Sequence, residues 1–201
     1  MLAEEGGLAE SKSDYRWVVD PLDGTTNYAH GFPVFSVSIA LQHKGETILG
    51  VVYDPMRDEL FTAERGGGAA LNQRPIRVSS TGDILQSLLS TGFPYDIKTS
   101  HLTNLEHWAN FAMHAQALRR VGSAALDLCY VACGRFDGFW ELSLNPWDMA
   151  AGALIVTEAG GRITDFQGNQ FSSYKPEVIA SNGLIHDRMI EVIAIDRSKG
   201  A

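Results

Sequence analysis

The sequence is poor in cysteine, and its two cysteines, Cys129 and Cys133, lie four positions apart in a stretch with helical periodicity. At that spacing two side chains share one face of a helix, where cysteine packs as a small apolar residue. The pair therefore does not predict a disulfide framework, and we expect a reducing, cytoplasmic environment. The chain also lacks a run of about 18 apolar residues, so no membrane-spanning helix is predicted. Residues 1–13 are acidic and glycine-rich rather than basic and then apolar, which is not the pattern of an export signal.

Positive charge is scarce as well. The chain has 16 Lys and Arg against 24 Asp and Glu, which gives a formal net charge of −8. This balance argues against a surface for nucleic acid or for an anionic membrane, so we expect neither as a direct partner. Hydrophobic residues make up 45% of the 201 residues, enough to fill the core of one large domain or of two smaller parts.

Strand patterns dominate the first half of the chain. The alternation of Val34, Ser36, Ser38 and Ala40 is typical of a strand with one buried face. The turns between neighbouring strands are too short for the crossover that parallel pairing requires, so we expect an antiparallel sheet. The predicted elements of this half are strands over 16–19, 34–42, 47–53, 59–63 and 87–91, a hairpin within 66–79, and a helix over 101–115.

Helices and strands alternate in the second half. Ser123 is a suitable N-cap and Gly134 a suitable C′ residue for one helix, and Asn145 followed by Pro146 is a strong helix start. The predicted elements are helices over 123–133, 146–159 and 183–194, and strands over 118–121, 136–142, 162–164 and 178–180. The sequence therefore predicts layered helices and sheets, α+β and then α/β, with an antiparallel-sheet part over 1–115 and an α/β part over 116–201.

Two aspartates follow the first strand closely. Asp20 and Asp23 flank Pro21 and Leu22 in the segment DPLDGTTN, so both carboxylates lie at the carboxyl end of a strand, where sites tend to gather. The stiff turn at Pro21 lets the carboxylates converge on one point and leaves the amides around Gly24 free to face an anion. For a bare DxxDG pattern, an Asp-Gly turn with capping carboxylates is the simpler interpretation.

Further carboxylates complete a candidate metal site. Asp148 is the third residue of the helix that begins at Pro146, where the helix dipole stabilises a negative charge by ~0.3–1 kcal/mol. Glu4, ahead of the first strand, is by itself a solvated terminal carboxylate. Together with Asp20 and Asp23 these residues suggest a site for hard cations, because Mg²⁺ takes oxygen ligands from carboxylates, water and substrate phosphate. An acidic protein can then bind an acidic substrate through bridging divalent ions.

Two long segments, WVVDPLDGTTNYAHGFP and PWDMAAGALIVTEAGG, resemble the inositol monophosphatase family, whose signatures are a DPxDGTxN segment and a WDxAAGxxxxxEAGG helix. The resemblance covers essentially the whole chain, including TGFP at 91–94 and GSAALDLCYVACGRFDGFWE at 122–141. It implies an α-β-α-β-α sandwich of the type shared with fructose-1,6-bisphosphatase. It also implies a Mg²⁺-dependent, lithium-sensitive phosphatase that is cytoplasmic and forms a homodimer when full length.

The resemblance assigns metal ligands residue by residue. It implies that roughly two or three Mg²⁺ ions are held by carboxylates and one backbone carbonyl, with Asp20 and Asp148 shared between ions. The implied ligands are Glu4, Asp20, the Leu22 carbonyl, Asp23 and Asp148.

Catalytic and substrate-binding roles come from the same resemblance. It implies a catalytic set of Thr25, Asp20 and Glu4, in which the Thr25 hydroxyl orients the attacking water. The amides of Gly24 and Thr25 are implied to bind the phosphate. The implied polyol contacts are Gly122, Ser123, Ala124, Glu141 and Asp148.

The family also carries a pair of helices ahead of the AEE segment, which pack on the first sheet and supply an acidic partner for the motif threonine. Here only Met1 and Leu2 precede the AEE segment, so we expect the first helical layer to be missing and the outer face of the first sheet to be bare. We also expect Glu4 to be poorly anchored so near a terminus. The aromatic residues Trp17, Trp147, Phe32 and Phe35 are expected to lie in the core rather than to stack on bases.

The mechanism that these roles favour is in-line attack of a metal-activated water on phosphorus, without a covalent enzyme intermediate. The implied substrate is a small phosphorylated polyol, in the first place inositol 1-phosphate. One alternative is a fructose-1,6-bisphosphatase or other sugar or nucleotide phosphatase, and the other is a non-catalytic partner of the transcription machinery. A bisphosphatase needs additional basic groups, and the candidates are Arg57, Arg65, Arg74, Arg77, Arg119 and Arg120.

Overall fold

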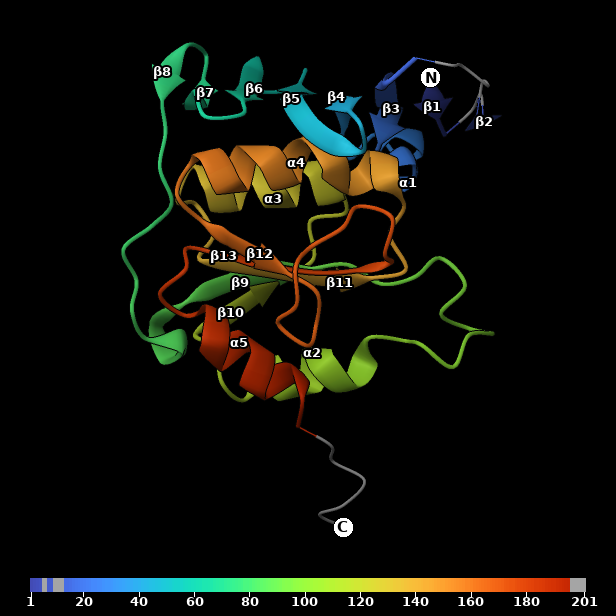
Figure 1. Ribbon diagram of the computed structural model, residues 1–201. Coiled ribbons are helices and arrows are strands. Elements are labelled where there is room, and N and C mark those ends of the chain that lie inside the picture. Colours follow the sequence, from blue (N-terminus) through green and yellow to red (C-terminus); the bar gives the residue numbers. More distant parts are fainter. Residues whose placement is uncertain (5–6, 9–12, 196–201) are drawn as a thin grey trace.

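The structure is a computed structural model that describes residues 1–4, 7–8 and 13–195. Its elements form four layers: a sheet, a pair of helices, a second sheet and a second pair of helices (Figure 1). The layered sandwich predicted from the sequence is confirmed, and no helix of the described residues lies over the outer face of the first sheet (Figure 1).

The first sheet has eight strands in the order β2-β1-β3-β4-β5-β6-β7-β8. These strands are β1 (Leu2–Ala3), β2 (Gly7–Leu8), β3 (Tyr15–Asp23), β4 (Ser36–His43), β5 (Glu46–Asp54), β6 (Glu59–Glu64), β7 (Gly68–Leu71) and β8 (Arg74–Pro75). From β3 to β8 all neighbours pair antiparallel, as their short turns predict. The sequence did not predict β1, which pairs parallel with β3 and extends the sheet beyond it.

The second sheet has the order β10-β9-β11-β13-β12 and is mixed. Its strands are β9 (Leu88–Thr91), β10 (Ala117–Arg119), β11 (Gly138–Leu142), β12 (Arg162–Thr164) and β13 (Glu177–Ser181). Strand β9 pairs parallel with β10 and β11, whereas β13 is antiparallel to its two neighbours. Because β9 belongs to this sheet, the chain passes from one sheet to the other between β8 and β9, earlier than the predicted division at residue 116.

Four helices cover the second sheet. Helices α3 (Ala124–Ala132) and α4 (Pro146–Glu158) lie between the two sheets, and α2 (Leu105–Ala112) and α5 (His186–Ile193) lie on the opposite face (Figure 1). Helix α2 is shorter than the predicted 101–115 because it begins only after Asn104. The predicted N-cap of α3 is confirmed, since the Ser123 hydroxyl accepts from the Leu126 amide at 3.3 Å. Both cysteines are free thiols, as predicted.

The two faces of the first sheet differ in which side chains they bury. An alternating strand pattern predicts that the larger apolar residues are buried, but here they are the more exposed ones. In β4 the buried residues, which face α4, are Ser36, Ser38, Ala40 and Gln42, while the larger apolar side chains between them are only half-buried. The close approach of α4 explains the small residues, because a Cβ on Gly50 in β5 would lie 2.8 Å from the Ala151 carbonyl oxygen.

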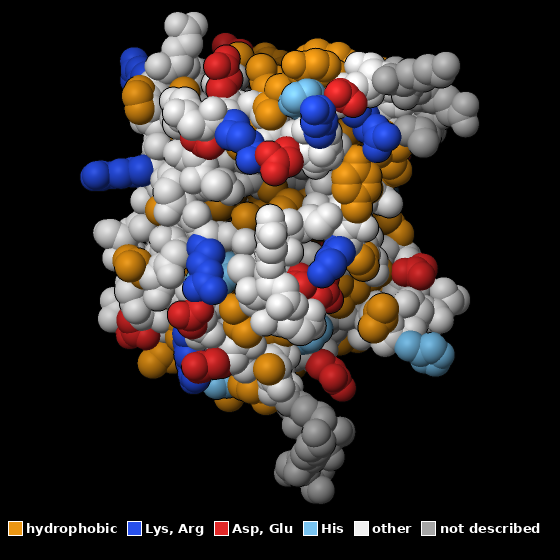
Figure 2. Space-filling model, viewed as in Figure 1, with side chains coloured by type: hydrophobic (Ala, Val, Ile, Leu, Met, Phe, Trp, Pro, Cys, Tyr) orange, Lys and Arg blue, Asp and Glu red, His pale blue; other side chains and the backbone are white. Residues whose placement is uncertain are grey.

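Large apolar side chains are therefore left at the surface. Trp17 is 46% exposed and Phe32 is 52% exposed, so the expectation that both lie in the core is wrong. Figure 2 shows hydrophobic side chains gathered along the top of the molecule, where the first sheet lies. We call the outward side chains of β3 to β6, which include Trp17, Ile39, Leu41, Val51 and Leu60, the outer face.

Candidate metal and phosphate site

The DPLDGTTN segment continues the strand instead of turning away from it. Asp20 pairs with Ser38 and Asp23 with Ser36, so three steps along β3 match two steps along β4 and a bulge lies between them. Strict alternation would send Asp20 and Asp23 to opposite faces, and the extra residue returns both to the inner face. Asp20 is 1% exposed and Asp23 is 8% exposed. The expected stiff turn at this point is wrong, because it is a bulged strand end.

A short helix that the sequence did not predict, α1 (Thr25–Ala29), follows the strand. Gly24 joins them with a φ of +93°, and a Cβ there would lie 3.0 Å from the Val34 carbonyl oxygen. Both the backbone conformation and the lack of space therefore require glycine. The Thr25 hydroxyl donates to the Leu22 carbonyl oxygen at 3.1 Å, which closes the link between strand and helix.

Helix α4 brings in the third carboxylate. Asp148 lies in its first turn and accepts a hydrogen bond from the Asn145 amide at 2.7 Å, so its carboxylate points back toward the helix start as predicted. One oxygen each from Asp20, Asp23 and Asp148 lies within 4.8 Å of the other two. Two elements far apart in sequence thus converge on one point.

Hydrogen bonds orient two of these carboxylates. Asp23 Oδ2 accepts from the Ala125 amide at 3.0 Å, from the Ser36 hydroxyl at 3.3 Å and from the Ser123 hydroxyl. Asp20 Oδ1 accepts from the Leu22 amide at 2.9 Å. One oxygen of each group is thus held by the protein, and the other is the natural ligand for a cation.

The electrostatics of the cluster favour a positive ion. Burial raises the pKa of Asp20 to about 8, and the negative charge of Asp23 adds to the rise. Burial likewise raises the pKa of Asp148 to about 7 and raises that of Asp23. Two buried carboxylates and a half-buried one at this separation destabilise one another as anions, and a divalent cation among them reverses that effect.

All five predicted metal ligands line one small hollow of about 70 Å³, which we call the metal hollow. Glu4 is exposed, yet it is anchored, because its amide donates to the Val19 carbonyl oxygen at 3.3 Å and the preceding residues form β1. The expectation that Glu4 is poorly anchored is therefore wrong. Gly24 and Thr25, the predicted phosphate-binding residues, line the same hollow.

A second hollow of about 60 Å³ adjoins the first, and we call it the side hollow. It shares Asp23, Glu141 and Asp148 with the metal hollow, so one ligand can extend across both. The predicted polyol contacts Gly122, Ser123, Ala124, Glu141 and Asp148 all line it. The Ser123 hydroxyl, however, bonds Asp23 and caps α3, so it supports a carboxylate from behind.

Sequence reasoning gave no role to several residues of these walls, and three of them have side chains that matter for recognition. Phe93 and Tyr95 line both hollows, and Asp127 lines the side hollow. Phe93 belongs to TGFP and Asp127 to GSAALD, segments that carried the family resemblance without a role for either residue. Tyr95 follows TGFP directly and is 85% exposed, so no pattern of burial marks it.

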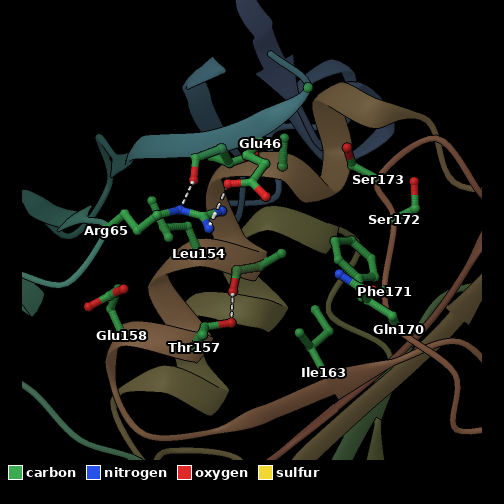
Figure 3. A pocket seen from close by; sticks show the side chains of 14 residues that line it. Glu46, Arg65, Leu154, Thr157, Glu158, Ile163, Gln170, Phe171, Ser172 and Ser173 are labelled. Carbon is green, nitrogen blue, oxygen red and sulfur yellow. Dashed lines mark hydrogen bonds and ion pairs between the residues drawn. The ribbon is translucent and has the colours of Figure 1, made fainter. Parts of the chain in front are cut away.

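A more spacious cavity, of about 290 Å³, lies along the flank of α4 (Figure 3). Its charged groups are already paired, because Arg65 contacts Glu46 at 3.1 Å and Glu158 accepts from the amides of Gly66 and Gly68. None of the predicted metal, catalytic or polyol-binding residues lines it, and of the arginines considered for a second phosphate only Arg65 does. The chemistry therefore concentrates at the two smaller hollows.

Comparisons with known proteins agree with this geometry. The family model described as the inositol monophosphatase family matches residues 1–197. An inositol-1-monophosphatase of Mesorhizobium japonicum is 44% identical over 193 residues, which are 96% of this chain and 73% of that protein. The Nus factor SuhB of Pseudomonas aeruginosa is 49% identical over 189 residues, 90% of this chain and 69% of that one.

A solved structure, that of an inositol monophosphatase from Anabaena (Nostoc) sp. PCC 7120, superposes with a TM-score of 0.93 at 46% identity. The match covers 96% of this chain and 77% of that one.

Among the residues that the structure describes, no helix is both long and apolar enough to span a bilayer.

Proposed function

Because the chain belongs to the inositol monophosphatase family, a family of phosphomonoesterases, we propose that it hydrolyses a small phosphorylated polyol with the help of Mg²⁺, in the first place inositol 1-phosphate. The observation that carries this proposal is the convergence of Asp20, Asp23 and Asp148 within 4.8 Å. They meet beside a second hollow that offers hydrogen-bond acceptors to a polyol.

The donor set fits Mg²⁺. Carboxylates are the hard oxygen ligands that this ion prefers, and the Leu22 carbonyl lines the same hollow as Glu4 and the three aspartates. When bound there, Mg²⁺ polarises a phosphoryl oxygen and makes a water molecule more acidic. The raised pKa values of Asp20 and Asp148 are the mark of a site whose carboxylates lack a counter-charge.

The remaining roles belong to the residues of this chain. The amides of Gly24 and Thr25 bind phosphoryl oxygens at the start of α1, and the Thr25 hydroxyl orients the attacking water. The Leu22 carbonyl holds that hydroxyl in place at 3.1 Å. Ser123 fixes the orientation of Asp23, and Glu141 accepts from a hydroxyl of the leaving group in the side hollow.

Substitution of the three aspartates tests the metal site. We expect Asp20→Asn, Asp23→Asn and Asp148→Asn each to lower kcat/KM for inositol 1-phosphate by ~10²-fold or more, since each removes an anionic ligand. Asp54→Asn is the matched control, because Asp54 is fully buried but lines neither hollow. Full activity in EDTA would contradict the proposal.

Glu141→Gln tests the substrate contact. A contact that exists before and during the transition state contributes to binding, so we expect KM for inositol 1-phosphate to rise more than kcat falls. Kinetic constants of Glu141→Gln equal to those of the parent would remove Glu141 from the polyol site.

Li⁺ at millimolar concentration is expected to inhibit turnover, as the family resemblance implies.

The structure bears unevenly on the two alternatives. Of the six arginines proposed for a second phosphate, only Arg120 lines either hollow in the described part of the chain, and Arg57 pairs with Asp54 at 3.0 Å. A bisphosphatase therefore has little support. The likeness to a Nus factor favours a role with the transcription machinery, and it predicts that the Asp20→Asn chain is retained by transcription complexes while its turnover is lost.

A further inference from the structure

Asp127 is a buried carboxylate with no assigned partner on one of its oxygens. It lies in the first turn of α3 and is the only acidic residue among the nine buried residues of that helix, AALDLCYVA. The residue is 1% exposed, and Ser90 is the one side chain of the described structure that donates a hydrogen bond to it. One hydroxyl leaves most acceptor positions of a buried carboxylate unfilled, so Asp127 calls for a further donor, which can come from the side hollow that it lines.

The surroundings show where such a donor would enter. Asp127 lines the side hollow together with Glu141, whose pKa is raised well above its ordinary value first by burial and then by the negative charge of Asp127. Ser90, fully buried on β9, donates its hydroxyl to the Asp127 carboxylate. Arg120 at the rim is the cation that partly offsets this negative charge.

The size and charge of the side hollow define the chemistry of its occupant. A volume of about 60 Å³ holds on the order of one or two groups the size of a water molecule, so it admits hydroxyls but not a whole ring. Two carboxylates require hydrogen-bond donors and repel a second phosphate. Neighbouring hydroxyls of one polyol meet both requirements.

We propose that Asp127 is a specificity-determining residue that accepts a hydrogen bond from a substrate hydroxyl next to the one bound by Glu141. The pair then selects leaving groups that carry two adjacent free hydroxyls, and Ser90, behind the wall of the side hollow, holds the Asp127 carboxylate through its hydrogen bond. This inference rests on the proposed phosphatase function and goes beyond it by naming a second acceptor for the polyol.

The test compares a polyol substrate with one that has no hydroxyl on its leaving group. Asp127→Asn keeps the size of the side chain and replaces one acceptor oxygen by an NH₂ donor. We expect it to raise KM for inositol 1-phosphate about 10-fold, the scale of one lost hydrogen bond to a charged group, with kcat nearly unchanged. KM for p-nitrophenyl phosphate is expected to change less than about 2-fold.

Asp54→Asn is the matched control, since it also replaces a buried aspartate and is expected to leave both KM values unchanged. Melting temperatures show whether each variant is folded, and Asp127→Ser is measured in the same way if the asparagine variant does not fold. An equal change for the two substrates, or no change for either, would overturn the inference.

Binding of inositol 1-phosphate, measured by calorimetry with Ca²⁺ in place of Mg²⁺, separates the inference from the proposed function. A parent protein that binds the polyol but hydrolyses neither substrate refutes the phosphatase activity, and the loss of affinity in Asp127→Asn then decides the inference alone. A parent that hydrolyses p-nitrophenyl phosphate without binding the polyol overturns the inference and leaves a phosphatase of another specificity.

Discussion

The two sheets of this protein are built for different surroundings. All five residues of β11 in the second sheet are buried, and helices cover both faces of that sheet. In the first sheet, β4 alternates between buried and half-buried residues, and the half-buried ones are the larger and more apolar. A sheet whose apolar side faces outward while small and polar residues face its own helices is built to be covered on both sides.

The two sheets also contribute differently to the stability of the protein and to its candidate site. The second sheet contributes packed apolar side chains, while the carboxyl end of β3 in the first sheet contributes two of the three clustered carboxylates. The site therefore depends on the sheet that has less cover.

The largest effect is expected from covering the outer face. Attaching the upstream segment of a longer relative ahead of Leu2 should bury on the order of 1,000 Å² of apolar surface, roughly 25 kcal/mol before the entropy of ordering is subtracted. We expect the parent chain to associate or aggregate, and the fusion to be monodisperse or dimeric with higher turnover. Light scattering and phosphate release measure both properties. A monodisperse parent whose turnover equals that of the fusion would show that the outer face needs no cover.

A smaller effect is expected from one tryptophan in each sheet. Trp140 in β11 is fully buried, stacks on Phe111 and donates through its indole N–H to Asn104 Oδ1 at 2.9 Å. Trp140→Ala should lower the free energy of unfolding by ~3–5 kcal/mol, as large cavities do. Trp17→Ala on the outer face is the matched control and should cost less than about 1 kcal/mol while reducing association. Equal losses in urea unfolding would contradict the contrast between the sheets.

The smallest effect is a pH dependence at the contact between α5 and the second sheet. His186 is fully buried, and its ring nitrogens lie 2.9 Å from the hydroxyls of Thr164 and Ser181. Burial lowers the pKa of His186 to about 4 from 6.5, so the unfolded chain binds the proton first as the pH falls.

His186 should therefore contribute a loss of stability from about pH 6.5 toward pH 4, roughly 2 kcal/mol at pH 5 relative to pH 7, while the raised pKa values of Asp20 and Asp148 act in the opposite direction. Urea unfolding of the parent and of His186→Gln between pH 7 and pH 5 isolates this contribution as the difference between their slopes. His30→Gln, at an exposed position, should keep the slope of the parent. An unchanged slope in His186→Gln would exclude this residue as the source.

Much of the fold follows from local patterns in the sequence. The caps at Ser123 and Asn145 and the alternation in β4 are local signals, and the helices and strands that they predict are present. The expectation that Trp17 is buried was wrong, because Trp17 lies on the outer face. Burial depends on which layer covers a strand and not on the sequence of the strand itself. The parallel pairing of β1 with β3 was equally invisible, since two residues carry no periodicity.

The site was predictable to a different degree. The motifs named the carboxylates, and the structure brings Asp20, Asp23 and Asp148 together, although their roles remain predictions. The bulge that turns Asp20 and Asp23 to the same face leaves no signal in DPLDGTTN. Asp127 was missed because a single acid in an apolar helix resembles a favourable charge near the helix start.

The bulge in β3 also changes how the site responds to mutation. It leaves the Leu22 carbonyl outside the regular ladder, where it accepts from the Thr25 hydroxyl and lines the metal hollow. A side-chain ligand disappears with one codon change, but a main-chain oxygen is present whatever amino acid the codon at position 22 specifies. Only a change in the length of the strand, such as an in-frame deletion, removes it. Part of the site is therefore protected from point mutation and is vulnerable to the loss of a single residue.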